Sequence, residues 1–239
     1  MSRARRMRRI LAACVFAPFF SIAVAGSLHS KPLSGFAPDK GAFRILVNGA
    51  QMGKEEFDIS PNGGSSGNDW IAHGASEIAA PDGTKTSVTG TLEFRGDGTP
   101  VRYEWSVQGA KKAAATVTFN GPVASIELRV AGARPFTQQL TFSSPQIVVL
   151  DNNLYYQYAV LAHIYDWEKK GPQTFSVLVP QENTPGTITV ESLGSQDVDG
   201  KKLDELGVKS EDLEVDVYLE GPRVVRIVVP SANAEIVRE

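Results

Sequence analysis

Hydrophobic and polar positions alternate over short runs along most of this chain. Phe43, Ile45 and Val47, for example, alternate with Arg44, and the turn pair Asn48-Gly49 follows them. A period of two is typical of a strand with one buried face. The same pattern predicts further strands over residues 55–59, 70–80, 88–94, 101–107, 116–119, 123–130, 134–142, 146–150, 174–179, 187–192, 213–219, 224–229 and 234–237.

Tight turns separate these strands. Residues 96–98, 120–122 and 220–222 each combine glycine with aspartate, asparagine or proline, which are the residues that hairpin turns prefer. Neighbouring strands joined by short turns pair in the antiparallel sense. The sequence therefore predicts a mainly β fold, a single antiparallel barrel or half-barrel of about a dozen short strands.

One stretch, residues 151–172, breaks the alternation and predicts a long helix over about 152–170. Three polar residues that favour helix N-caps stand before it, and two lysines, a glycine and a proline stand at its end. Between them Leu154, Tyr158, Leu161 and Tyr165 recur at the spacing of one helical face. These signals favour a helix that is covered on nearly all sides by the strands.

This helix supplies the candidate binding residues. A second apolar run, which includes Trp167, lies beside the first one, so only a narrow polar strip remains. The helix is expected either to plug a solid barrel or to form a lid over an apolar cavity. If there is a cavity, its lining is expected to include Leu154, Tyr158, Leu161, Tyr165 and Trp167.

The N-terminus has the pattern of a secretory signal peptide. Five arginines precede an apolar run that ends in Ala23-Val24-Ala25, a small-x-small cleavage signal. We therefore expect residues 1–25 to be removed, residues 26–40 to be a flexible leader, and residues 41–239 to be one β-rich domain. The apolar run is short for a membrane-spanning helix, so the mature protein is not expected to be an integral membrane protein.

Cleavage would change the composition in two ways. The remaining 19 basic and 27 acidic residues give a net charge of about −8, which disfavours binding to nucleic acid. The single cysteine, Cys14, would leave with the signal peptide, which excludes disulfides, thiol nucleophiles and thiolate metal sites. We expect an exported protein of the periplasm or cell envelope, or a secreted one.

Candidate catalytic residues are few. Apart from His29 in the leader, the histidines are His73 and His163, and His163 stands three residues before Asp166. These side chains would form a metal or acid–base site if the fold gathered them, but a histidine and an aspartate also suit the polar strip of a helix. No catalytic residue, metal site or cofactor is therefore assigned, and a hydrolase is the least favoured of three functions.

The sequence resembles a known protein family, mainly over two predicted hairpins. The runs that carry this resemblance are Gly41-x-Phe43-x-Ile45-x-Val47-Asn48-Gly49, Gly53-x-Glu55-x-Phe57-x-Ile59, Leu150-Asp151, Leu213–Leu219 and Arg223–Ile227. Together they resemble an exported bacterial family known as domain-of-unknown-function 3108. The resemblance implies an exported antiparallel β-barrel without assigned catalytic residues. More remotely, strands around a helix look like the half-barrels that carry lipoproteins or lipids across the periplasm.

Two non-catalytic functions therefore lead. The first is binding of an apolar ligand, such as a lipid or acyl chain, by the helix and the strands around it. The second is a structural or interaction module of the cell envelope that contacts another protein. An exposed apolar patch or a bare strand edge would favour the second function.

Overall fold

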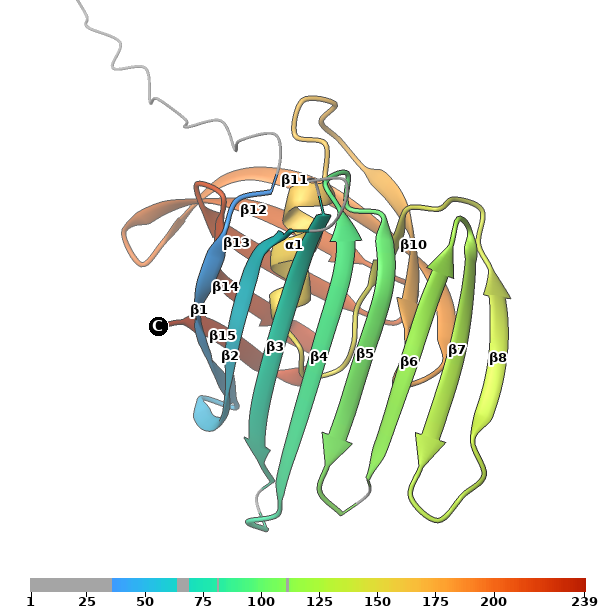
Figure 1. The fold of residues 1–239 in the computed structure, drawn as a ribbon. Coiled ribbons are helices and arrows are strands. Elements are labelled where there is room, and N and C mark those ends of the chain that lie inside the picture. The colour runs from blue at the N-terminus through green and yellow to red at the C-terminus, as the bar shows by residue number, and fades with distance from the viewer. Residues whose placement is uncertain (1–35, 64–68, 81, 111) are drawn as a thin grey trace, which may run out of the picture. The chain divides into compact units, whose positions relative to one another are not determined.

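The computed structural model describes residues 36–239 except 64–68, 81 and 111. These residues form one continuous β-sheet and one α-helix (Figure 1). The strands are β1 (Asp39–Val47), β2 (Ala50–Asn62), β3 (Asp69–Ala79), β4 (Lys85–Arg95), β5 (Pro100–Gln108), β6 (Ala113–Asn120), β7 (Val123–Val130), β8 (Phe136–Thr141), β9 (Ile147–Val149), β10 (Gln173–Val179), β11 (Thr184–Val198), β12 (Lys201–Lys209), β13 (Glu214–Glu220), β14 (Arg223–Val229) and β15 (Ala234–Arg238). The helix is α1 (Tyr156–Ile164), and a short 3-10 helix, η1 (Pro230–Ala232), precedes β15.

The sheet has 15 strands in the order β8-β7-β6-β5-β4-β3-β2-β1-β15-β14-β13-β12-β11-β10-β9. It consists of two meanders that join where β1, the first strand, pairs with β15, the last. The two outermost strands, β8 and β9, do not pair with each other, so the described sheet is open. This confirms a mainly β fold with one helix, whereas closure into a barrel is not established.

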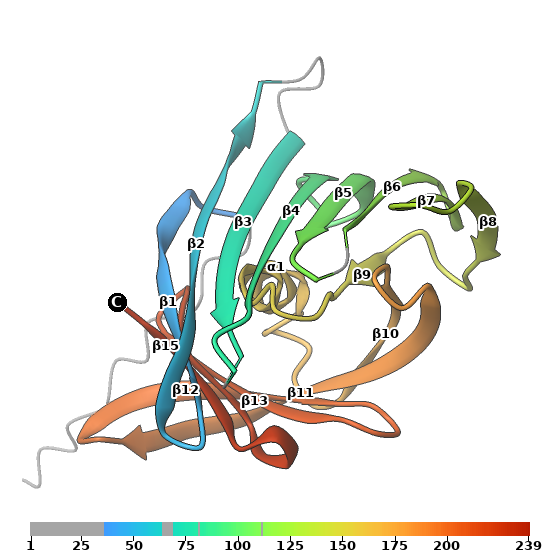
Figure 2. The same cartoon turned by 90° about the horizontal axis from the view of Figure 1, so that it is seen from below.

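The two meanders face each other across a shared apolar core. In Figure 2, α1 lies between the strands of the first meander and those of the second. The helix packs against β3 from one meander and β14 from the other. Strand residues alternate as predicted, with Phe43, Ile45, Phe57 and Ile59 among the buried inner-facing side chains.

The helix is shorter than predicted. It has nine residues, Tyr156–Ile164, instead of about 152–170. Asp151 is not the N-cap, because its carboxylate is already bonded to other groups, and Asn153 has a left-handed φ of 66°. At the other end, Tyr165 leaves the helix with extended dihedral angles (φ −61°, ψ 127°).

Two strands also differ from expectation. Strand β12 lies within residues 193–212, where no strand is predicted, because its charged residues and Gly207 hide the alternation. Strand β9 pairs with β10 in the parallel sense, while every other strand pair in the described sheet is antiparallel. The helix lies between these two strands in the chain and provides the crossover that a parallel pair requires.

Candidate functional site

A glutamate that is distant in the sequence caps the helix. Glu55, on β2, accepts hydrogen bonds from the backbone N–H groups of Tyr155 (2.8 Å) and Tyr156 (3.3 Å). The first N–H groups of a helix have no partner within the helix, and their partial positive charge favours a carboxylate. Glu55 therefore does the work expected of the polar residues before the helix.

Burial changes the chemistry of this carboxyl group. The Glu55 side chain is fully buried, and burial raises its pKa to about 8, although the two backbone N–H donors oppose the shift. Its neighbour Glu56 points to the exposed face of β2, as expected for adjacent strand residues. The alternation of Glu55 with Phe57 and Ile59 in the sequence is the pattern that places Glu55 on the apolar face.

A second buried carboxyl group, that of Asp151, holds the segment before the helix. It accepts hydrogen bonds from the hydroxyl of Tyr103 (2.7 Å) and the backbone N–H of Gln181 (2.8 Å). Burial raises the pKa of Asp151 to about 7, although these two hydrogen bonds act to lower it. Gln157 completes the group, because its side-chain N–H donates to the Tyr103 hydroxyl and its oxygen accepts from the Asp151 backbone.

A pair of glycines makes room for the helix above these groups. Gly74 on β3 and Gly90 on β4 are paired across the sheet. A Cβ atom at Gly74 would lie 2.3 Å from Tyr156 Cδ1, and one at Gly90 would lie 2.6 Å from Leu154 Cδ1. The helix start therefore lies directly on the backbone of the sheet, an approach that only glycine permits.

The five predicted lining residues divide into two groups. Leu154, Leu161 and Tyr165 are buried by the protein's own side chains, while Tyr158 and Trp167 are half-buried. Tyr165 and Trp167 contact each other edge-to-face, with ring centroids 5.1 Å apart. Neither of the two described hollows, of about 480 and 380 Å³, is lined by any of these five residues.

The two described histidines, His73 and His163, do not converge. His73 lies on the outer face of β3, where its ring nitrogen Nδ1 is 2.9 Å from the hydroxyl of Thr91. His163, at the end of the helix, contacts the ring of Phe36 at a centroid distance of 5.1 Å. Asp166 accepts hydrogen bonds from the backbone N–H groups of residues 168 and 169. No metal-binding group of three or more His, Cys, Asp or Glu occurs within the described residues.

The first meander ends in a strand edge that no other described strand covers. Strand β8 has the sequence Phe-Thr-Gln-Gln-Leu-Thr, without a charge or a proline, and its register with β7 is continuous. Natural edge strands are usually protected by charges, prolines or bulges. The opposite edge, β9, has only three residues, all buried, and lies against β5.

Exposed apolar side chains lie beside this edge. Phe136 is 49% exposed and Val130 is 40% exposed, and both lie on the inner face with the half-buried Leu128. We call these three residues and the bare edge of β8 the free corner. The free corner was not predicted from the sequence, because only the order of strand pairing places β8 at an edge.

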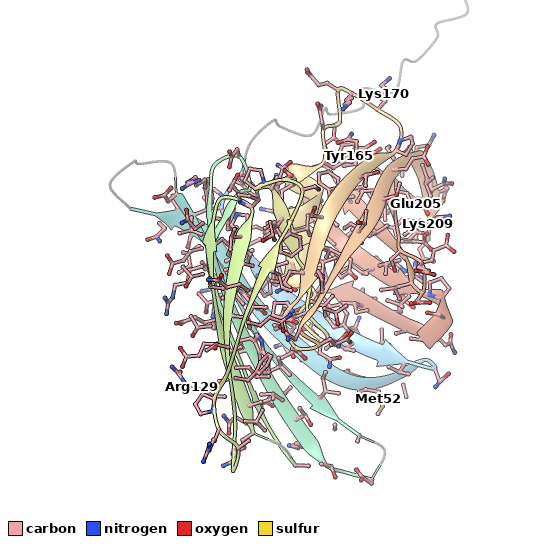
Figure 3. The ribbon with its side chains drawn as sticks, turned by 90° about the vertical axis from the view of Figure 1, so that its right-hand side faces the viewer. Met52, Arg129, Tyr165, Lys170, Glu205 and Lys209 are labelled. Carbon is pink, nitrogen blue, oxygen red and sulfur yellow. The ribbon has the colours of Figure 1, made fainter. Side chains whose placement is uncertain are left out.

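The outer face of the same strands is polar. Thr137 and Gln139 of β8 lie beside Glu127 and Ser125 of β7. Arg129, which is ion-paired with Glu127 at 2.7 Å, lies on the outer side of the first meander (Figure 3). The free corner is thus apolar on its inner face and polar on its outer face. The apolar part of the inner face ends at Gln138, whose side-chain oxygen accepts a hydrogen bond from Asn183 in the β10–β11 turn.

Other expectations concern residues that the structure does not describe. The predicted signal peptide, residues 1–25, lies outside the described range, and so does most of the leader. Within residues 36–239, gaps aside, no helix has the length and apolar character needed to cross a membrane.

Comparisons with known proteins support the fold alone. No protein-family model matches the sequence, and no curated protein matches it, so the resemblance to domain-of-unknown-function 3108 stays a prediction. A β-barrel-like protein of domain of unknown function DUF1849 from Brucella abortus is similar in structure, with a TM-score of 0.58, 9% identity, and coverage of 87% of this chain and 97% of that one. A DUF1089 family protein from Pseudomonas aeruginosa has a TM-score of 0.47 and 7% identity over 74% of this chain and 90% of that one.

Proposed function

We propose that this protein is a non-catalytic binding module whose strand β8 pairs with an extended segment of another protein. The observation that carries the proposal is the bare, uncharged edge of β8 beside exposed apolar side chains at the free corner. Addition of a strand to a sheet edge is a common way to bind peptide segments, because the backbone hydrogen bonds need no particular sequence.

The register shows which backbone groups of β8 are available. The N–H of Phe142 donates to the carbonyl of Pro122, so the strand alternates from this bonded pair. In an antiparallel ladder, every second residue points both backbone groups away from its neighbour. The N–H and C=O groups of Thr137, Gln139 and Thr141 therefore point to the open side.

The free corner would add side-chain contacts to this pairing. A partner strand places alternate side chains on the inner face, beside Phe136, and the others on the polar outer face. Covering Phe136 and Val130 removes apolar surface from water, which contributes roughly 25 cal/mol per Å².

A proline substitution tests the pairing directly. Gln139→Pro removes an N–H that points outward, whereas Gln139→Ala keeps it, so the two variants separate backbone pairing from side-chain effects. The probe is a fluorescent peptide of sequence Thr-Val-Thr-Val-Thr-Val-Ser-Ser with blocked ends. We expect the wild type and Gln139→Ala to bind it within about twofold of each other, and Gln139→Pro to bind about tenfold more weakly.

The same measurement can contradict the proposal. Equal binding by the proline variant, with its far-ultraviolet circular dichroism unchanged, would show that the edge of β8 is not the binding surface. Absence of binding by the wild type would contradict pairing at this edge as well.

A second candidate function is binding of an apolar ligand, such as a lipid or acyl chain, in the periplasm of a bacterial envelope. The observation that favours it is the position of Phe136 and Val130 on the inner face, which is continuous with the core. Native mass spectrometry before and after organic extraction tests this function. A lipid-sized mass that is lost on extraction supports it, whereas a mass equal to that of the bare chain favours strand pairing.

A further inference from the structure

The free corner lies in a part of the protein with a local excess of basic residues, although the protein as a whole is acidic. The whole sequence has a formal net charge of −3. Within the described residues 112–141, however, the charged side chains are Lys112, Arg129 and Arg134 against the single acid Glu127. Lys112 lies next to the β7–β8 loop, since its carbonyl accepts a hydrogen bond from Ala131 (2.9 Å).

The position of Arg134 shows which end of β8 carries this basic charge. It is exposed in the loop before β8, two residues before Phe136, so it lies at the N-terminal end of the strand. An antiparallel partner runs opposite to β8, and its C-terminal end therefore lies next to Phe136 and Arg134. An acidic group at that end of the partner would be attracted by Arg134 and Lys112.

We infer that the partner of β8 is an antiparallel strand with apolar side chains at alternate positions and carboxylates at its C-terminal end. This inference rests on the proposed function, because it specifies the segment that binds at the same edge. The alternation follows from the apolar inner face and the polar outer face of the free corner, and the carboxylates follow from the local basic charge.

A strand fits this corner better than an anionic membrane surface does. Phe136 and Val130 lie on the inner face of the sheet, whereas Arg129 lies on the outer face. A flat surface cannot contact both faces at once, because successive side chains of a strand point in opposite directions. A partner strand has two faces of its own and can meet both.

Three peptides with blocked ends test the inference by fluorescence anisotropy at low salt. They are Thr-Val-Thr-Val-Thr-Val-Asp-Asp, the same peptide ending in Lys-Lys, and Asp-Asp-Thr-Val-Thr-Val-Thr-Val. We expect the first to bind about fivefold more tightly than the second, in line with a few exposed charge pairs. We expect the third to bind more weakly than the first, because its acidic end lies away from Arg134.

Charge-reversal variants assign the effect to the corner. Arg134→Glu should reverse the preference between the acidic-ended and lysine-ended peptides. Arg95→Glu makes the same charge change at the exposed end of β4 and should leave the preference as in the wild type. Gln139→Pro should weaken binding of all three peptides, which distinguishes strand pairing from general electrostatic attraction.

The outcomes separate the two proposals. If the wild type binds all three peptides equally, the inference about the acidic end is wrong and the pairing at β8 stands. If it prefers the peptide with acidic residues at the N-terminal end, the antiparallel orientation is wrong. If no peptide binds, both proposals fail. Binding of phosphatidylglycerol vesicles that is lost in Arg134→Glu, without peptide binding, would assign the corner to a membrane surface.

Discussion

Glu55 caps the helix from a distant position in the sequence, in place of the polar residues that directly precede the helix. The polar residues at positions 151–153 suit a helix N-cap, but the N–H groups at the start of α1 are bonded to a carboxylate from β2 about a hundred residues earlier in the chain. The sequence signals for helix caps lie in the residues next to the helix, so they do not identify a cap from another strand. The cap was therefore beyond local reasoning, although the inward-facing position of Glu55 was not.

The raised pKa of Glu55 predicts a pH dependence of stability. Its pKa is about 8 in the folded protein, against an ordinary value of 4.5 for a glutamate side chain. The folded chain therefore retains a proton that the unfolded chain releases between these values, so the free energy of unfolding falls as pH rises from about 4.5 to 8. Asp151, raised to about 7, acts in the same direction.

Glu55→Gln keeps an oxygen acceptor for the helix N–H groups and removes the titration. We expect the slope of unfolding free energy against pH to become less negative by up to about 1.4 kcal/mol per pH unit. Urea unfolding between pH 5 and 8 measures this slope, and Glu56→Gln, on the exposed face, is the control. An unchanged slope in Glu55→Gln would mean that Glu55 stays ionised in the folded protein.

At the scale of elements, the strands were more predictable than the helix. Fourteen predicted runs correspond to strands, because most of these strands have one face in the core and the other in water. Strand β12 was missed because its charged residues and Gly207 interrupt the alternation, although Glu205, on its outer face, is buried. The helix was predicted too long because lysines, a glycine and a proline also suit the loop that follows it.

That loop is held by tertiary hydrogen bonds. The Tyr165 hydroxyl donates to the carbonyl of Gly171 (2.9 Å) and accepts from the N–H of Ser192 on β11 (3.1 Å). The side chain of Gln173 bonds both to the backbone N–H and to the carbonyl of Asp166. These bonds end the helix at a point that its own sequence does not mark.

Removing the Tyr165 hydroxyl tests this account. Tyr165→Phe leaves two backbone groups without their partner, so we expect the free energy of unfolding to fall by about 1–2 kcal/mol. Amide hydrogen exchange should accelerate at Ser192, while exchange at Val190, in the core of the same strand, should follow only the global change. Unchanged protection at Ser192 would contradict a role of this hydroxyl in holding the loop.

At the scale of the whole described chain, an arginine joins the ends of the two meanders. Arg238 on β15 forms two hydrogen bonds with Asp39 on β1, at 2.6 and 2.8 Å, and both side chains are largely buried. Its guanidinium also lies 5.1 Å from the ring centroid of Phe57. A Cβ atom at Gly41 would lie 2.9 Å from this group, so the glycine leaves space for it.

Breaking this pair should weaken the junction. Arg238→Met keeps the apolar stem but leaves the largely buried Asp39 with only its longer contact to Arg223, at 4.0 Å, so we expect the free energy of unfolding to fall by about 2 kcal/mol. Arg44→Met is the matched control, because the ion pair of Arg44 with Glu239 is exposed and should contribute less than about 1 kcal/mol. Equal effects of the two substitutions in denaturant titrations would contradict the special role of Arg238.

Which strand lies at the edge of the sheet was not predictable from local patterns. Strand β8 alternates like its neighbours, and only the pairing order shows that no described strand lies beyond it. The predicted site, in contrast, followed from the apolar helix and identified residues that mostly pack into the core. Periodicity reports which side chains face inward, but not whether protein or a ligand covers them.

The pairing of β1 with β15 has a consequence for synthesis of the chain. A ribosome makes the first meander completely before the strands that face it exist, and β15, which pairs with β1, is made after all the other described strands. The apolar inner side of β1–β8 therefore has no cover in the nascent chain until the strands of the second meander have been made. While this surface is uncovered the chain is prone to aggregate, so we expect chaperones to bind it during synthesis.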